Sequence, residues 1–294
     1  MAKLRVHTMT YYLGIDGGGT NTRCTLYDQE GTKIDTLTLP SIHFMKVSPK
    51  QMSDTLNEAK QYFKKTNHSI KVALGLGGYG ANEDIRKLIE TAVYSVFPSA
   101  LIMNDAQLAL HASLGQDDGI FLISGTGSIA LYQKDKIQTR RGGFGYLIGD
   151  EGSAFWIGKK ILERFTQEVD TRIPRTDLYE KMMTHLKLNS PQDIIKVIAD
   201  QNDNYRNFLA QLSYTMKDCE GVEDIYTQAG HELARLANSF QYEKSTPLAI
   251  GGSVLQNNNI VRNSLIKNLN PDLAFINTPH EAEYAAYRLL KDSQ

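Results

Sequence analysis

Short apolar runs separated by polar residues open the chain, and several of them stop at glycine. The first covers residues 11–15, and two more follow at 23–27 and 34–39. Runs this short, bounded by turn residues, are typical of β-strands. Met52, Leu56, Ala59 and Phe63 then recur at helical spacing after Pro49, which predicts an amphipathic helix. The pattern continues as strand, helix, strand and helix over residues 70–74, 82–97, 100–103 and 106–114.

The same order of elements begins again near residue 120. Three strands are predicted, after which residues 152–242 are almost wholly helical, and the chain ends in strand, helix, strand and helix. We therefore predict one β-rich α/β unit used twice, with a helical insertion in the second copy and no linker between the copies. The ranges that carry this prediction are 119–123, 129–132, 136–139, 248–250, 258–269, 273–276 and 281–290.

Composition and charge narrow the class of partner. The hydrophobic fraction of 41% and the charged fraction of 22% are near those of soluble globular chains. A net charge of −1 argues against nucleic-acid or polybasic membrane binding and favours a small molecule. No apolar run reaches membrane-spanning length, and two isolated cysteines, Cys24 and Cys219, exclude a disulfide framework. We expect a cytoplasmic protein.

Glycine is concentrated in five places. Of the 23 glycines, 18 fall within residues 14–19, 75–80, 125–127, 142–158 and 251–252. Each interior glycine costs about 0.5–1 kcal/mol relative to alanine, so such grouping indicates tight turns or close approach of a ligand to the main chain.

The first hairpin carries Asp16, Gly17, Gly18, Gly19, Thr20 and Asn21. Main-chain N–H groups and the Thr20 hydroxyl suit phosphate oxygens, and Asp16 suits a hydrated Mg²⁺. An ordinary β-turn is the alternative, although such a turn does not need three successive glycines.

The first hairpin of the second copy repeats this design with Gly125, Thr126 and Gly127. Two such turns facing each other across a cleft would hold a nucleoside triphosphate from both sides. Gly251, Gly252 and Ser253, between a strand and a helix, suit an adenine and ribose, or form an ordinary loop.

Asn104 and Asp105 end a predicted strand, where a carboxylate faces the ligand crevice of an open α/β sheet. Asp105 is our candidate base for an alcohol, with helix capping as its alternative. In the fourth cluster, Asp150 suits sugar hydroxyls that approach Gly145, or complements a helix dipole.

A rival interpretation rests on Gly75, Gly77 and Gly80. They form GxGxxG after a strand and before a helix, and Asp105 follows the next strand, which is the pattern of an NAD-binding Rossmann unit. Two strands and a helix precede the motif, however, and the other glycine turns stay unexplained.

Taken together, these motifs resemble the BadF/BadG/BcrA/BcrD ATPase family, and within it the amino-sugar kinase branch typified by N-acetylglucosamine kinase. The resemblance covers residues 11–290. It implies the actin/hexokinase/Hsp70-like (ASKHA, ribonuclease H-like) α/β fold, with two domains closing over ATP and Mg²⁺. The implied domains are residues 1–111 with 278–294, and residues 112–277 with the helical insertion.

The resemblance also implies roles for the matching residues. Asp16 and Thr20 would serve metal and phosphate, Gly125–Gly127 a second phosphate contact, and Gly251–Gly252 the adenosine. Asp105 would be the base, and the positions lying against the sugar would be Asn104, Asp105, Thr126, Gly145 and Asp150. One departure is Ile42, which stands where the family usually carries a sugar-binding asparagine.

The expected function is therefore ATP-dependent phosphorylation of an amino sugar such as N-acetylglucosamine or glucosamine at O6, by a homodimer. One alternative is the family's other branch, an ATPase that activates a CoA-ester dehydratase or reductase through an iron–sulfur cluster, which needs suitably placed thiolates. A sensor without turnover is another alternative.

Overall fold

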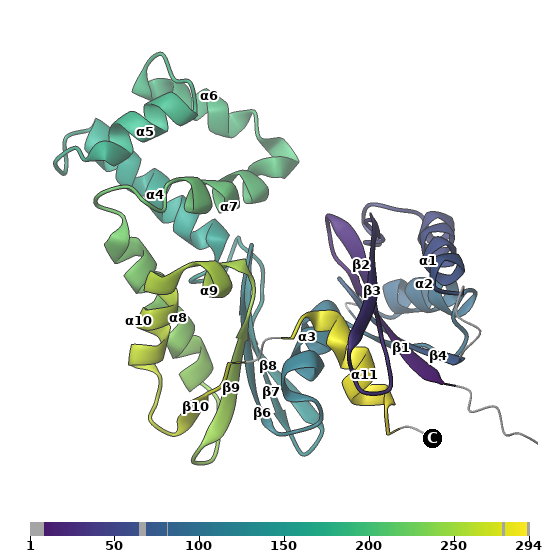
Figure 1. Cartoon of the computed structure of the whole chain (residues 1–294). Coiled ribbons are helices and arrows are strands. Elements are labelled where there is room, and N and C mark those ends of the chain that lie inside the picture. Colours follow the sequence, from purple (N-terminus) through teal and green to yellow (C-terminus); the bar gives the residue numbers. More distant parts are fainter. Residues whose placement is uncertain (1–8, 65–68, 81, 278–279, 293–294) are drawn as a thin grey trace, which may run out of the picture. The chain divides into compact units, whose positions relative to one another are not determined.

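The computed structural model describes residues 9–64, 69–80, 82–277 and 280–292, and the chain forms two compact units (Figure 1). The described residues within Met1–Asp117 and Thr278–Gln294 form unit 1, and Asp118–Asn277 form unit 2. The last segment of the chain therefore belongs with the first. No helix in the described ranges is both long and apolar enough to cross a bilayer.

Unit 1 is built on a five-stranded sheet in the order β3-β2-β1-β4-β5. The elements are β1 (Thr10–Gly17), β2 (Asn21–Tyr27), β3 (Lys33–Pro40), α1 (Pro49–Phe63), β4 (Ser69–Leu76), α2 (Glu83–Tyr94), β5 (Leu101–Met103), α3 (Asp105–Leu114), the 3₁₀ turn η3 (Ala282–Tyr284) and α11 (Ala285–Leu290).

Unit 2 is built on a second five-stranded sheet, β10-β9-β6-β7-β8. The elements are β6 (Gly119–Ser124), β7 (Ser128–Lys134), β8 (Ile137–Gly142), α4 (Ala154–Val169), α5 (Asp177–His185), η1 (Pro191–Asp193), α6 (Ile194–Ala199), η2 (Asn202–Asn204), α7 (Tyr205–Thr215), α8 (Glu223–Asn238), β9 (Thr246–Gly251), α9 (Ser253–Asn257), α10 (Asn259–Asn268) and β10 (Leu273–Phe275).

The two sheets share one topology, which confirms the predicted repetition. In unit 1, β1 is antiparallel to β2 and parallel to β4, and β4 is parallel to β5. In unit 2, β6 is antiparallel to β7 and parallel to β9, which is parallel to β10. The turn between β1 and β2 therefore occupies the same topological position as the turn between β6 and β7.

Helices cover both faces of the unit 1 sheet. Leu13 and Ile15 of β1 pack with buried residues of α1 and α2. Tyr12, on the opposite face of the same strand, packs with buried residues of α3 and α11. Because side chains alternate along a strand, Asp16 lies on the α3 side of the sheet.

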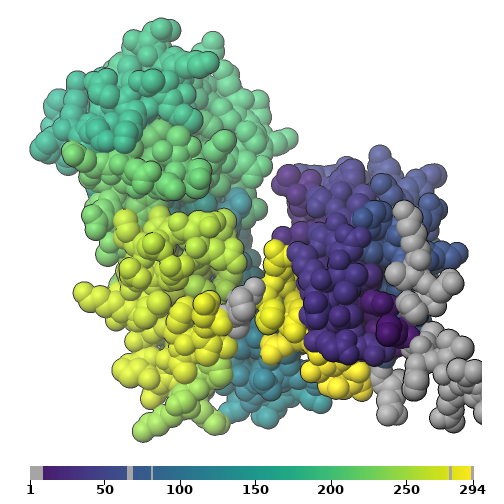
Figure 2. Space-filling view, in the orientation of Figure 1, coloured from purple at the N-terminus to yellow at the C-terminus, as the bar shows by residue number. Residues whose placement is uncertain are grey.

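The predicted helical insertion is confirmed as α4 to α8. In the ribbon and space-filling views, α5, α6 and α7 gather at one end of unit 2, drawn in teal and green (Figures 1 and 2). The helix predicted over residues 258–269 is preceded by a separate short helix, α9, which begins at Ser253. The predicted final helix divides into η3 and α11.

The C-terminal segment packs directly onto β1 at Gly14. A Cβ atom placed on Gly14 would lie 2.0 Å from the main-chain oxygen of Glu283. The Glu283 carboxylate is fully buried and forms a bidentate pair with Arg23, whose Nη2 donates to Oε2 at 3.0 Å. Glycine at position 14 therefore lets the end of the chain complete unit 1.

We predict that Gly14→Ala lowers the free energy of unfolding by about 2–3 kcal/mol, because main chain on both sides must move apart. Gly19→Ala is the matched control, since a Cβ at Gly19 meets nothing within 4 Å. Thermal unfolding followed by circular dichroism compares the two variants. Equal melting temperatures for both would contradict the close packing at Gly14.

Candidate active site

Two side chains from the loop that follows β3 hydrogen-bond to the turn between β1 and β2. The hydroxyl of Ser41 donates to the carbonyl of Gly18 at 2.8 Å. The ammonium of Lys46 donates to the carbonyl of Gly19. Two successive carbonyls of the turn are thus directed toward residues 41–46.

This arrangement turns main-chain donors outward. In a trans peptide the N–H points opposite to the carbonyl, so the N–H groups of Gly19 and Thr20 point away from Ser41 and Lys46. Within the described residues, neither N–H has a hydrogen-bond partner. Adjacent free N–H donors of this kind bind anions.

The turn between β6 and β7 has the same construction with different anchors. The carbonyl of Gly125 accepts from the N–H of Ala154 at 2.8 Å, and that of Thr126 from Phe155 at 3.4 Å. Both anchors belong to the first turn of α4. The N–H groups of Thr126 and Gly127 therefore point away from α4, without partners in the described part of the chain.

Carboxylates gather at the edge of the unit 1 sheet. Asp16 is in register with Gly75 of β4, which is in register with Met103 of β5, so Asp16 lies near the start of α3. Burial raises the pKa of Asp16 to about 7, with the charges of Glu283 and Asp105 adding to the rise and Arg23 opposing it. The Asp16 carboxyl group is therefore partly protonated near neutral pH, and a nearby cation would favour its ionised form.

Helix capping at this edge falls to Asn104, which leaves Asp105 available. The side chain of Asn104 accepts from the N–H of Gln107 at 2.7 Å and is the N-cap of α3. The Asp105 side chain is exposed, and among the described residues only its Oδ1 is hydrogen-bonded, by the N–H of Ala106 at 2.9 Å. The prediction that left capping open for Asp105 is thereby resolved.

His43 is a neighbour of Asp105 that the sequence motifs did not single out. Its Nδ1 accepts from the N–H of Met45 at 3.3 Å, which places the proton of the neutral ring on Nε2. Burial lowers the pKa of His43, while the charge of Asp105 opposes this and that of Lys46 adds to it. The imidazole is therefore a neutral hydrogen-bond donor beside the carboxylate.

Packing explains Ile42 and two glycines of the GxGxxG loop. Ile42 is 1% exposed and lies in the core on the α1 side of the sheet. A Cβ at Gly77 would lie 2.8 Å from the His43 ring, and one at Gly78 would lie 2.1 Å from the Phe44 ring. A Cβ at Gly75 would lie 2.5 Å from the Leu108 side chain, so Gly75 and Gly77 make room for protein side chains, whereas a Cβ at Gly80 would meet nothing within 4 Å.

Asp150 is buried beside the turn between β6 and β7, which is called the second turn below. It is 3% exposed, has a left-handed backbone φ of 63°, and accepts from the main-chain N–H groups of Ser128 and Gly145. Burial raises its pKa, while these hydrogen bonds and Arg206 oppose the rise. The N-cap of α4 is Ser153, whose hydroxyl accepts from the N–H of Trp156 at 3.2 Å.

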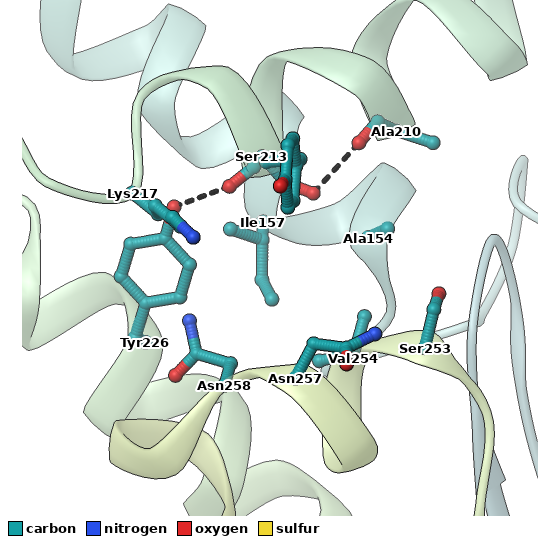
Figure 3. A pocket seen from close by; sticks show the side chains of 11 residues that line it. Ala154, Ile157, Ala210, Ser213, Lys217, Tyr226, Ser253, Val254, Asn257 and Asn258 are labelled. Atoms are coloured by element: carbon teal, nitrogen blue, oxygen red, sulfur yellow. Dashed lines mark hydrogen bonds between the residues drawn. The ribbon is translucent and has the colours of Figure 1, made fainter.

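The loop after β9 lies against the second turn and borders a pocket. Gly252 has a φ of 88°, and a Cβ there would lie 2.3 Å from the Ser124 carbonyl. Ser253 reaches a cavity of about 90 Å³, several times the ~10–15 Å³ that one water needs (Figure 3). Its lining comes from α4, α7 and the turn that follows it, α8, α9 and the start of α10: Ala154, Ile157, Ala210, Ser213, Tyr214, Lys217, Tyr226, Val254, Asn257 and Asn258, besides Ser253.

Each unit therefore assembles its own half of the predicted residues. Unit 1 brings together Asp16, the turn from Gly17 to Asn21, Asn104 and Asp105. Unit 2 brings together the turn from Gly125 to Gly127, Gly145, Asp150 and the loop from Gly251 to Ser253. Ser41 and His43, which flank Ile42, and Lys46 lie near the half in unit 1, and Arg206 lies near the half in unit 2.

The two cysteines do not fit a shared iron–sulfur cluster. Cys24 lies in the core of unit 1 and Cys219 in that of unit 2, and both are buried. Burial raises the pKa of Cys24 to about 12, so its thiol stays protonated. These positions weigh against the activator alternative.

Paired α/β units of this topology, each with a glycine turn at its central hairpin, define the actin/hexokinase/Hsp70-like class of fold. The chain belongs to the BadF/BadG/BcrA/BcrD ATPase family, which it matches over residues 13–287. The predicted fold class and family are thereby confirmed.

Relatives and solved structures agree with this assignment. An N-acetyl-D-glucosamine kinase of Dictyostelium discoideum is 27% identical over 96% of this chain and 98% of its own. An N-acetylmuramic acid/N-acetylglucosamine kinase of Clostridium acetobutylicum is 27% identical over 95% and 97%. A solved structure from Chromobacterium violaceum has a TM-score of 0.72 at 20% identity, covering 94% of this chain and 97% of that one.

We predict that Lys46→Met weakens ATP binding about tenfold, because a freed Gly19 carbonyl no longer fixes the direction of the next N–H. Isothermal titration with a non-hydrolysable ATP analogue measures the affinity. Lys50→Met, which removes an exposed lysine of α1, is the control. Unchanged ATP affinity in Lys46→Met would show that the hydrogen bond from Lys46 does not contribute to ATP binding.

Proposed function

We propose that this chain is an ATP-dependent kinase that phosphorylates an amino sugar such as N-acetylglucosamine or glucosamine at O6. The observation that carries the proposal is the pair of matching turns, each with two outward N–H donors and a carboxylate nearby. The names of the full-length relatives support a phosphotransferase with an alcohol group as acceptor.

In this proposal main-chain donors of both turns bind phosphate oxygens of ATP. The donors of unit 1 are the N–H groups of Gly19 and Thr20, and those of unit 2 are the N–H groups of Thr126 and Gly127. The pocket beside Ser253 receives the adenosine, since Ile157 and Val254 give it apolar surface and Asn257 and Asn258 offer amide groups (Figure 3). Gly251 and Gly252 bring main chain close to the ribose.

The residues of unit 1 also fit Mg²⁺. Mg²⁺ is usually held by one or two carboxylates together with phosphates and water. Asp16 supplies such a carboxylate, and no cluster of three or more metal-ligating side chains occurs among the described residues. Bound Mg²⁺ would neutralise phosphate charge there, and it would favour the ionised form of Asp16, whose pKa is raised to about 7.

Asp105 is the proposed base. The proton of the acceptor hydroxyl passes to its free Oδ2, the acceptor oxygen bonds to the γ-phosphorus, and the bond from that phosphorus to the β–γ bridging oxygen breaks, which releases ADP. Asn104, Thr126, Gly145 and Asp150 are proposed to contact the sugar. We further assign His43 as a hydrogen-bond donor to it, in place of the amide that Ile42 does not provide.

We predict that Asp105→Asn lowers kcat by about 10²-fold or more, because the amide cannot accept the hydroxyl proton, while ATP affinity is kept. The assay measures ADP release with glucosamine, N-acetylglucosamine, N-acetylmuramic acid, N-acetylmannosamine and glucose. Asp84→Asn, at an exposed position in the first turn of α2, is the control. Full turnover by Asp105→Asn would refute the assignment of the base.

We predict that Ala210→Phe raises the KM for ATP about tenfold or more, because the ring fills the pocket beside Ser253. Gln211→Phe places the same ring on an exposed position of α7 and is the matched control. The KM for the sugar should change little in either variant. A normal KM for ATP in Ala210→Phe would place the adenosine elsewhere.

A further inference from the structure

Arg206 brings a guanidinium to the second turn from outside the repeated sheet. It lies in the first turn of α7, in the helical insertion. Its Nη2 is 3.5 Å from Oδ2 of Asp150. A Cβ atom on Gly127 would lie 2.7 Å from this Nη2 and 2.7 Å from Oδ2 of Asp150. One cation thus borders both the turn and the buried carboxylate.

The Arg206 guanidinium is only partly used by the protein. The pair with Asp150 is long and engages a single oxygen, and the buried Nε atom has no hydrogen-bond partner in the part of the chain that the structure describes. The side chain is 42% exposed. By contrast, Arg164 makes two bonds to Asp224, at 2.6 and 2.5 Å. Among the described residues, Arg206 therefore has N–H groups without a protein acceptor, unlike an arginine whose role is only structural.

The turn between β6 and β7 has glycine at position 127, where the turn between β1 and β2 has threonine, and the nearby Arg206 explains the difference. Gly18, Gly19 and Thr20 separate β1 from β2, and Gly125, Thr126 and Gly127 separate β6 from β7, so Gly127 corresponds to Thr20. A side chain at position 127 would displace Arg206 or Asp150. The second glycine of this turn thus makes room for a charged group beside the outward N–H donors.

We propose that Arg206 is a catalytic residue that neutralises charge on the transferring phosphoryl group. This assignment rests on the proposed kinase function, in which the turn holds phosphate and Asp150 faces the acceptor. The phosphoryl group passes from ATP at the turn to the acceptor hydroxyl beside Asp150, and Arg206 borders both the turn and Asp150. It forms and breaks no covalent bond in the transfer described above and gives up no proton, since a guanidinium stays charged.

The test compares Arg206→Gln, Arg206→Lys and Arg206→Ala with the wild-type protein. Removing one preorganised donor from a developing charge typically costs about 10²–10³ in kcat. We expect Arg206→Gln to lose about 10²-fold in kcat, with the KM values for ATP and sugar within about threefold of wild type. Arg206→Lys should lose less, because it retains a cation without the planar fork. Arg235→Gln, an exposed arginine of α8, is the control.

Two further measurements separate catalysis from folding. Wild type with sugar and ADP should be inhibited tightly by aluminium fluoride, which mimics the transferring phosphoryl group, and Arg206→Gln should lose this inhibition while its ADP affinity is kept. Millimolar guanidinium should restore part of the turnover of Arg206→Ala but none of that of Asp105→Asn. Both measurements apply even where a variant has a lower melting temperature.

Three other outcomes distinguish a failure of the proposed kinase function from a failure of the role assigned to Arg206. If wild type phosphorylates none of the five sugars, the proposed function fails. If wild type is active and Arg206→Gln turns over normally, the kinase stands and the role of Arg206 is wrong. If Arg206→Gln raises only the KM for the sugar and keeps aluminium fluoride inhibition, Arg206 binds the acceptor instead, and the catalytic assignment is overturned.

Discussion

The planar trans peptide is the constraint on which the candidate site depends. A turn whose carbonyls are hydrogen-bonded on one side must present the following N–H groups on the other. In unit 1 the anchors are the side chains of Ser41 and Lys46, and in unit 2 they are the N–H groups of Ala154 and Phe155. Both turns therefore present N–H groups on the side opposite to the hydrogen bonds that their carbonyls accept.

The different anchors give the two turns different properties. Main-chain anchors at the start of α4 are fixed by the helix itself. The anchors of the first turn are the side chains of Ser41 and Lys46, and holding the exposed lysine in one rotamer costs free energy. The two turns thus reach the same main-chain arrangement through different anchors.

The end of the chain also contributes to the candidate site. Glu283 passes over Gly14 and pairs with Arg23. Burial raises the pKa of Asp16, and the charge of Glu283 adds to the rise. The segment that completes unit 1 thus also contributes to the electrostatics of Asp16.

Local sequence patterns determined the strands, most helices, the duplicated order and the two glycine turns. These features depend on hydrophobic periodicity and turn chemistry, which act between residues close in sequence. The division of roles between Asn104 and Asp105 needed the structure, because the start of α3 shifts by one residue between the two possibilities.

Tertiary structure decided which distant side chains complete each half of the site. His43 reaches Asp105 because Ile42 takes the core position and Gly77 leaves space, and Arg206 reaches Asp150 from 56 positions away. No periodic pattern records such contacts, because they depend on how whole elements pack. The sequence alone therefore predicted the glycine turns and the carboxylates of Asp16, Asp105 and Asp150, and only the folded structure identified His43, Lys46 and Arg206 beside them.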